Sequence, residues 1–282
     1  MTWLIVILLG VIQGVTEWLP VSSTGHMLLF EDFLVMDVTP SFRNLFMVVI
    51  QLGSILAVPV LFWGRLWPFG RGKNPAGRRE CLSLWGKVLL ASLPAAVLGI
   101  LLDDWIEGVV YAIPAVKCAV IALSLIVYGI GFIAVERCLS GGADRVNTTT
   151  ELTLRGSFVI GCFQVLSLIP GTSRSGSTVI GARLLRVARP AAAEFSFFLA
   201  IPVMFGASFL KLGKYFLVDG QTLDARECGL LFLGFAVAFL VSLAVIRFLL
   251  DFVRRHSFVP FGWYRIALGA AVLLYGYLRY FR

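Results

Sequence analysis

Two short polar stretches interrupt an otherwise apolar chain, and both hold residue types that can bind or attack a phosphorus centre. The first stretch, residues 17–26, combines a carboxylate, several hydroxyls and one of the two histidines. A serine oxygen assisted by a histidine can attack phosphorus, and a histidine can also be the nucleophile itself or the base for a water. The candidates for this chemistry are Glu17, Ser22, Ser23, Thr24 and His26.

The second stretch, residues 170–178, has the sequence Pro-Gly-Thr-Ser-Arg-Ser-Gly-Ser-Thr and suits an oxyanion. Arg174 brings a permanent positive charge with a planar fork that matches phosphate oxygens. Helices that start at about Ser22 and Ser173 would direct two positive dipole ends to one point. The alternative is a capped helix with a glycine turn. The hydroxyls that would support Arg174 belong to Ser173, Ser175 and Thr178.

The spacing within the first stretch predicts a serine and histidine pair. If a helix starts near Ser22, Ser23 and His26 lie three residues apart on one face and come within hydrogen-bond reach. Ser22 then suits the N-cap and Ser23 the nucleophile, although the two serines can exchange these roles. The plainer alternative makes His26 a helix cap or a hydrogen-bonded core residue.

Gln13 and Glu17 lie four residues apart, on one face of a predicted helix. Glu17 can orient His26, or it can hold a divalent cation, Mg²⁺ or Ca²⁺, with the help of Gln13. Such a cation would bridge phosphate oxygens and neutralise charge that develops in the transition state. The alternative for Gln13 is a bond to the backbone.

The composition places both stretches in a membrane. Hydrophobic residues make up 59% of the chain and charged residues only 14%, against about 25% in soluble domains. A charge at mid-bilayer costs at least about 2.5 kcal/mol, so Glu17 must lie in a protein-lined cavity with a partner or ligand. The net charge of +8 comes from short loops and one arginine motif, which excludes a nucleic-acid partner. Five scattered cysteines predict neither a zinc site nor a disulfide framework.

The apolar segments predict how these stretches are held. Residues 2–19 are interrupted by Pro20, and the next piece, 27–38, is too short to cross a bilayer. Such a pair predicts a re-entrant hairpin whose polar tip is buried in protein at membrane depth. By the positive-inside rule, the basic loop at 65–87 lies in the cytoplasm and both termini lie outside. Six segments are predicted to span the membrane: 42–63, 84–102, 114–135, 195–212, 231–253 and 259–276.

The order of these segments is repeated. Residues 161–170 echo residues 10–20, and in each case a cluster of Ser, Thr and Gly follows a proline. Three spans then follow each hairpin in the same order, which predicts an internal duplication. A half with one hairpin and three spans crosses the membrane an odd number of times, so the second half is predicted to be inverted and the tips to meet at mid-membrane.

The predicted fold is therefore an all-α integral membrane protein with six transmembrane helices plus two re-entrant helical hairpins in an inverted-topology repeat. It forms a single membrane domain over residues 1–282. The first repeat covers residues 1–139, the linker 140–151 and the second repeat 152–282.

Several of these motifs carry a resemblance to a known family. Gln13-x-x-x-Glu17, residues 19–26 and residues 170–178 resemble the two signature regions of the undecaprenyl-diphosphate phosphatases of the bacitracin-resistance type. The similarity covers nearly the whole chain, because other stretches resemble the family as well. These are residues 46–54, 194–197 and 257–261.

The resemblance implies a multi-pass enzyme of the bacterial inner membrane, surrounded by membrane lipids. It would hydrolyse the terminal phosphate of a polyprenyl diphosphate lipid, undecaprenyl diphosphate, and return the monophosphate carrier to cell-wall synthesis. It further implies an active site open to the periplasmic face and dependence on a divalent cation.

The resemblance also implies roles for individual residues. The catalytic residues would be Glu17, Ser23, His26 and Arg174. The substrate-binding residues would be Gln13, Ser22, Thr24, Ser173, Ser175 and Thr178. The family's first motif has Glu or Gln where this chain has Gln13, so Glu17 must carry more of the metal coordination.

The main alternative is a prenyl-phosphate transporter or flippase, because inverted repeats with broken helices are also a transporter architecture. A carrier needs an anion site but no serine and histidine facing it, which favours the phosphatase. A structural scaffold is a third hypothesis, disfavoured because Glu17 and Arg174 would then lie in the membrane without a purpose. The sequence leaves open whether the nucleophile is Ser23, His26 or water, and whether the chain forms a homodimer.

Overall fold

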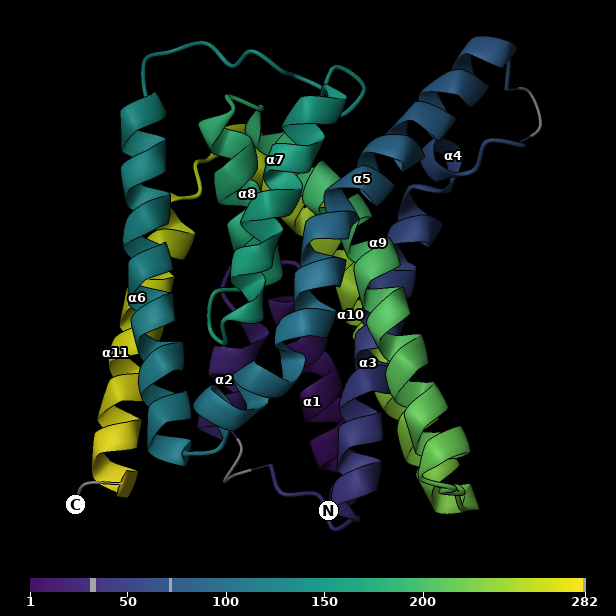
Figure 1. Cartoon of the computed structure of the whole chain (residues 1–282), viewed down its shortest axis with the longest axis vertical. Helices are drawn as coiled ribbons and strands as arrows, with labels where there is room; N and C mark the ends of the chain where they lie inside the picture. The colour runs from purple at the N-terminus through teal and green to yellow at the C-terminus, as the bar shows by residue number, and fades with distance from the viewer. Residues whose placement is uncertain (31–33, 71–72, 281–282) are drawn as a thin grey trace.

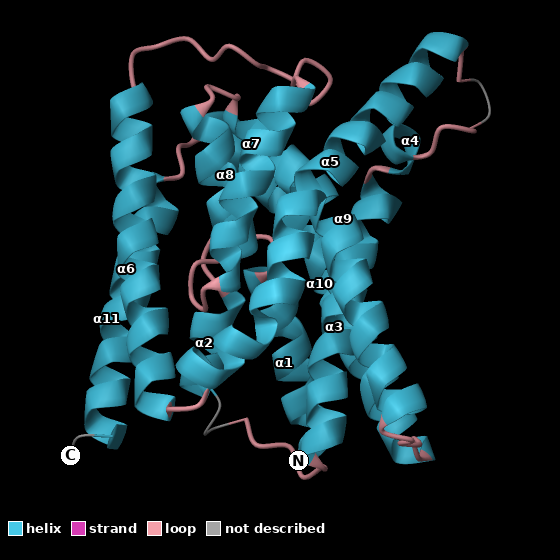
Figure 2. Cartoon of the chain, viewed as in Figure 1, coloured by secondary structure: helices cyan, strands magenta, loops and turns pink. Residues whose placement is uncertain are grey.

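The computed structural model describes residues 1–30, 34–70 and 73–280, which are mainly helical (Figure 2). Within these ranges the β structure is limited to an isolated parallel bridge between Val146 and Val187. The principal helices are α1 (Thr2–Thr16), α2 (Ser23–Phe30), α3 (Pro40–Leu61), α4 (Trp63–Leu66), α5 (Pro75–Ile106), α6 (Pro114–Leu139), α7 (Leu154–Val165), α8 (Arg174–Leu184), α9 (Arg189–Gly213), α10 (Ala225–Arg255) and α11 (Val259–Tyr280).

Six helices in the described ranges are long and apolar enough to cross a membrane. They are α3, α5, α6, α9, α10 and α11. Five of them contain their predicted span in full, and α3 covers residues 42–61 of the predicted span 42–63. The prediction of an all-α, multi-pass membrane protein is confirmed.

The start of α5 differs from the sequence prediction. The helix begins at Pro75 rather than near residue 84, because proline suits the first helical position and the side chain of Asn74 accepts from the N–H of Gly77 at 2.8 Å. Lys87, which the sequence assigned to a basic loop, is therefore buried in the helix and donates to the carbonyl of Thr150 at 2.8 Å. Part of that loop, including Arg71, lies outside the described residues.

Two helix pairs, α1 with α2 and α7 with α8, are each broken by a polar turn. In Figure 1, α1 and α2 lie in the half of the molecule that contains both termini, while α7 and α8 lie in the half crossed by the loop from α6 to α7. Gly171 in the second turn has φ +92°, and an added Cβ would lie 2.6 Å from the carbonyl oxygen of Ile121. Only glycine fits that turn, because it must be left-handed and in contact with α6.

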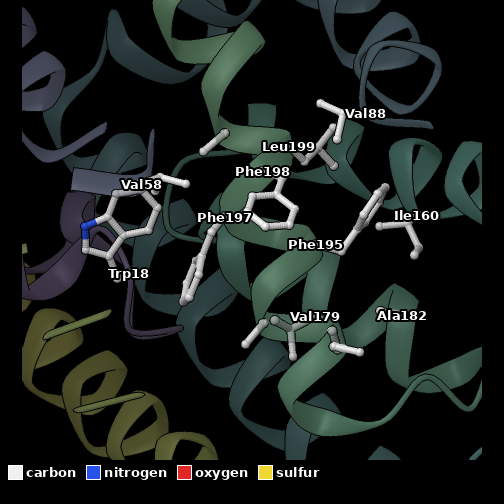
Figure 3. Close-up of a cluster of buried hydrophobic side chains, with 14 of the residues drawn as sticks. Trp18, Val58, Val88, Ile160, Val179, Ala182, Phe195, Phe197, Phe198 and Leu199 are labelled. Atoms are coloured by element: carbon white, nitrogen blue, oxygen red, sulfur yellow. The ribbon is translucent and has the colours of Figure 1, made fainter. Parts of the chain in front are cut away.

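The two broken helix pairs are packed against the long helices in a corresponding way. α1 packs on α10 and α7 packs on α5, while α10 also contacts α3 and α5 also contacts α9. α6 and α11 approach closely at Gly129 and Gly262, where a Cβ on either residue would lie 2.7 Å from the carbonyl oxygen of the other. A buried aromatic cluster on α9 fills the space behind the turns, where Phe197 contacts Trp18 edge-on at 5.2 Å between ring centroids (Figure 3). The two polar turns therefore rest on closely packed helices.

Candidate active site

A polar cavity of about 190 Å³ separates the two turns. Both turns contribute to its wall, together with a side chain from α3 and one from α9. The lining residues are Thr16, Glu17, Ser23, Thr24, Gln51, Ser167, Leu168, Ile169, Pro170, Gly171, Ser173, Arg174 and Met204. We call residues 17–22 with the start of α2 the first tip, and residues 166–173 with the start of α8 the second tip.

An ion pair joins the tips across this cavity. Nη2 of Arg174 donates to Oε1 of Glu17 at 3.2 Å, and the two side chains are only 11% and 6% exposed. Gln13 donates to Oε2 of Glu17 at 3.0 Å, so both carboxylate oxygens are bonded. Nη1 of Arg174 is fixed by the carbonyl of Ser196 at 2.7 Å. The sequence predicted that Glu17 and Arg174 face the same space, and the structure brings them into contact.

Both tips end in a helix N-terminus with the same cap. Ser22 Oγ accepts from the N–H of Gly25 at 3.4 Å, and Ser173 Oγ accepts from the N–H of Gly176 at 3.3 Å. Ser22 is thus the N-cap and Ser23 is the first residue of α2, as the sequence favoured. The positive ends of α2 and α8 both face the cavity, which suits it to an anion.

His26 has different partners from those the sequence predicted. Its Nδ1 lies 2.7 Å from the carbonyl oxygen of Ser22, and its Nε2 lies 2.6 Å from the hydroxyl of Tyr264. Because a carbonyl oxygen can only accept, Nδ1 of the neutral ring carries the proton and Nε2 accepts from Tyr264. The expected bond between Ser23 and His26 is therefore replaced by bonds to Ser22 and to α11, and His26 does not line the cavity.

Two predicted hydroxyls hold α8 in place instead of lining the cavity. Thr178 Oγ1 lies 2.7 Å from Ser196 Oγ on α9, and both residues are fully buried. Ser175 Oγ lies 3.1 Å from Ser173 Oγ and 3.4 Å from the carbonyl oxygen of Glu17. Ser173, Ser23 and Thr24 do reach the cavity.

Three residues with a clear relation to the site were missed by the sequence reasoning. Gln51 on α3 lines the cavity, Tyr264 bonds to His26, and Arg265 is a fully buried cation that bonds to both tips. The sequence contains a feature that could have indicated two of them. Gln51 and Arg265 are a polar and a charged residue within apolar spans, which by itself marks a functional position in a membrane protein.

The donors at the cavity suit a hard cation held partly by substrate. Among the described residues, no cluster of three or more His, Cys, Asp or Glu side chains forms a ready metal site. Glu17 is the carboxylate at the cavity, with the hydroxyls of Ser23 and Thr24 nearby on its wall. Mg²⁺ is commonly bound by one or two carboxylates together with substrate phosphates, so this donor set fits it.

These features define a class: a multi-pass helical membrane protein with a buried, polar, anion-suited cavity between two helix N-termini. Comparison with known families identifies the class more narrowly. Residues 6–271 match the family model described as Bacitracin resistance protein BacA, and the chain belongs to this family. The resemblance noted from the sequence motifs is confirmed.

Relatives of similar length carry one name. A protein of Enterococcus faecalis is 47% identical over 269 residues, which cover 95% of each chain. A protein of Streptococcus mutans is 48% identical over 274 residues, covering 97% of this chain and 95% of the relative. One from Acetivibrio thermocellus is 48% identical over 269 residues, covering 95% and 96%. All three are named undecaprenyl-diphosphatase.

Proposed function

We propose that this protein is a membrane phosphatase that hydrolyses the terminal phosphate of undecaprenyl diphosphate, giving undecaprenyl phosphate and inorganic phosphate. The observation that carries the proposal is the buried pair of Arg174 and Glu17 at a cavity faced by two helix N-termini. The names of the relatives support the same activity and do not favour a transporter. The monophosphate would serve as lipid carrier in cell-wall synthesis.

Arg174 binds the terminal phosphate in this proposal. A diphosphate that enters the cavity presents its oxygens to the guanidinium group, where they replace the carboxylate of Glu17. The N-terminal amides of α2 and α8 stabilise the remaining negative charge. In-line transfer needs mainly positioning and charge neutralisation, and both tips contribute to these.

Ser23 is the proposed nucleophile, because it lines the cavity at the start of α2. Its Oγ attacks the terminal phosphorus, the bond from phosphorus to the bridging oxygen breaks, and the prenyl monophosphate leaves. The proton of Ser23 passes to Nε2 of His26, which first gives up its bond to Tyr264. His26 then gives this proton to the departing monophosphate. Water hydrolyses the phosphoserine, and its proton returns to Ser23 Oγ as phosphate leaves. Acid quenching followed by mass spectrometry should trap phosphate on Ser23, and its absence would favour direct attack by water.

Glu17 is the residue proposed to hold a divalent cation, Mg²⁺ or Ca²⁺, with Gln13 fixing its carboxylate. When bound, the cation would neutralise charge on the phosphate oxygens. Glu17 and Gln13 also keep the first tip polar at membrane depth.

An apolar pocket beside the cavity offers a place for the lipid chain. It has a volume of about 170 Å³, and Thr24 lines both it and the polar cavity. A diphosphate at the tips would therefore place the first isoprene units in this pocket. Its other walls are formed by Leu9, Met27, Leu28, Phe30, Leu34, Arg43, Met47 and Lys117.

We further infer that the helix pairs are re-entrant hairpins in an inverted repeat and that the site opens to the periplasmic face of a bacterial inner membrane. The corresponding packing of α1 on α10 and of α7 on α5 supports the repeat. The basic start of α5 and the loop after α6 lie at the end of the molecule opposite the termini (Figure 1), which supports termini outside.

The decisive experiment measures phosphate release from farnesyl and undecaprenyl diphosphate by protein purified in detergent. Wild type should release phosphate, while Arg174→Ala and His26→Ala should not, and Arg254→Ala on the exposed end of α10 serves as control. Wild-type rates in either site variant would exclude the proposed mechanism. Movement of prenyl phosphate across proteoliposomes without loss of diphosphate would instead establish the transporter.

A further inference from the structure

A buried arginine outside the cavity connects the two tips. Arg265 lies on α11, is 0% exposed and is absent from the cavity wall. Its Nη1 donates to the carbonyl oxygen of Pro20 at 3.1 Å. Its Nη2 donates to the carbonyl oxygens of Gly171 and Thr172 at 2.9 and 2.8 Å. One planar group therefore bonds to the backbone on both sides of the site.

The bonded carbonyl groups lie next to the reacting side chains. Pro20 lies between Glu17 and Ser23, and Thr172 precedes the capped start of α8 and Arg174. These carbonyls are at chain turns, where backbone acceptors lack helical partners and must find others when buried. Arg265 supplies these partners, so the separation of the two tips depends on it.

The surroundings of Arg265 are shaped to its guanidinium. A Cβ added at Gly176 would lie 3.1 Å from Nη1, so glycine at this position leaves room for the group. The ring of Tyr128 on α6 lies 5.3 Å from the guanidinium carbon and covers it. Carbonyl oxygens at 2.8–3.1 Å offset the cost of burying the charge.

We propose that Arg265 is a positioning residue for phosphoryl transfer. It fixes the backbone of the first tip relative to that of the second, so that Ser23 and Arg174 act on the same phosphorus atom. A misplacement of about 1 Å can reduce a rate about 100-fold, which is why a residue without substrate contact can control turnover. The catalytic part of this proposal rests on the phosphatase activity proposed above, whereas the connection between the tips does not.

The test compares Arg265→Lys with wild type by two measurements on protein in detergent. Lysine keeps the buried charge but cannot form three bonds from a rigid fork. We expect kcat for farnesyl diphosphate to fall about 100-fold, with KM changed by less than about threefold. We also expect faster hydrogen–deuterium exchange in peptides from both tips.

The matched control is Arg183→Lys, which changes another buried arginine at the far end of α8. Arg183 is 3% exposed and bonds to Glu136 and Asp144. This variant should retain wild-type kcat and wild-type exchange at the tips, so a general effect of replacing a buried arginine would be recognised.

Two further variants keep the test decisive if Arg265→Lys folds poorly. In purified Arg265→Ala, added guanidinium ions should restore part of kcat, which a simple folding defect would not allow. In Gly176→Ala, the added methyl group meets Nη1, the donor to Pro20, so exchange should rise most in the first tip.

Unchanged tip exchange and kcat in folded Arg265→Lys would overturn the proposal. A rise in KM with unchanged kcat would also overturn it, because that result indicates direct substrate binding. If wild type released no phosphate while the variants still loosened the tips, the proposed function would fail and the structural role of Arg265 would stand.

Discussion

The two tips share a backbone conformation and differ in chemistry. Ser22 and Ser173 have φ values of 73° and 68°, and each caps a helix by accepting from a glycine N–H three residues later. The residue that follows is Ser23 in the first tip and Arg174 in the second. The same scaffold therefore presents a nucleophile candidate on one side of the cavity and a permanent cation on the other.

The helices that lead into the tips differ in the same way. Gln13 on α1 bonds to Glu17, whereas Gln164 on α7 is followed four residues later by Leu168. Gln164 is fully buried, and neither atom of its amide has a hydrogen-bond partner within the described chain. A polar pair is thus complete in one half and incomplete in the other. Backbone similarity is therefore a poor guide to which half carries the charge chemistry.

The largest expected effect separates equivalent positions in the two tips. His26 and Ser177 each lie four residues after the capping serine. His26→Ala should lower kcat on the order of 10²–10⁴-fold, because it removes the proposed proton acceptor. Ser177→Ala, which loses a bond to Tyr128, should stay within about threefold. Equal effects in phosphate-release assays would show that the two tips are functionally alike.

The next effect concerns the cation of the second tip. Arg174→Lys keeps the charge but loses the fork that bonds both Glu17 and the Ser196 carbonyl. We expect kcat/KM to fall about 100-fold. Arg254→Lys, on the exposed end of α10, provides the comparison, and a similar loss there would point to an assay artefact.

The apolar pocket belongs to the first half alone, since all its lining residues lie between 9 and 117. Met47→Trp should fill it and raise KM for farnesyl diphosphate about tenfold, while kcat/KM for isopentenyl diphosphate changes less. Steady-state kinetics with the two substrates test this. An equal rise in KM for both substrates would show that the lipid chain binds outside this pocket.

A second carboxylate on α1, next to the first tip, should strengthen the proposed binding of the metal. Gln13→Glu would put two acids next to the cavity, and we expect the Mg²⁺ concentration for half-maximal activity to fall about tenfold. Gln164→Glu, at the corresponding place on α7, is the control. If the Mg²⁺ concentration for half-maximal activity is the same in Gln13→Glu as in wild type, Glu17 does not bind the metal.

The smallest effect is expected at Gln164 itself. Gln164→Met removes a buried amide without partners and should stabilise the protein by about 1–3 kcal/mol, seen as a higher Tm in detergent, with kcat unchanged. Gln13→Met leaves Oε2 of Glu17 without its donor, although Arg174 still bonds Oε1, and should lower kcat instead. A lower Tm for Gln164→Met would show that its amide is bonded after all.

Much of this arrangement follows from local patterns. Apolar length predicted the six spans, and the proline and serine spacing predicted the capped helix starts at Ser22 and Ser173. The cost of a charge in the membrane predicted that Glu17 needs a partner, and Arg174 is that partner. These inferences succeeded because each depends on a few neighbouring residues or on a cost that any fold must meet.

What could not be predicted depends on contacts between distant segments. Tyr264 is 238 residues from His26, and Arg265 is 245 residues from Pro20, so no spacing rule relates them. The bond expected between Ser23 and His26 failed for the same reason, because a partner on α11 competes for the ring. A charge within an apolar span could have indicated Arg265, but only the packing of distant segments shows that its hydrogen bonds go to both tips.

The mutual neutralisation of Arg174 and Glu17 has a consequence for the end of each turnover. Once the detached phosphate moves away from the guanidinium, a carboxylate already 3.2 Å from it in the resting protein is ready to take its place. Inorganic phosphate must then compete for Arg174 with the carboxylate of Glu17, which belongs to the same protein and is always present beside the guanidinium. Product inhibition by free phosphate should accordingly be weak, and turnover can continue where that anion is abundant.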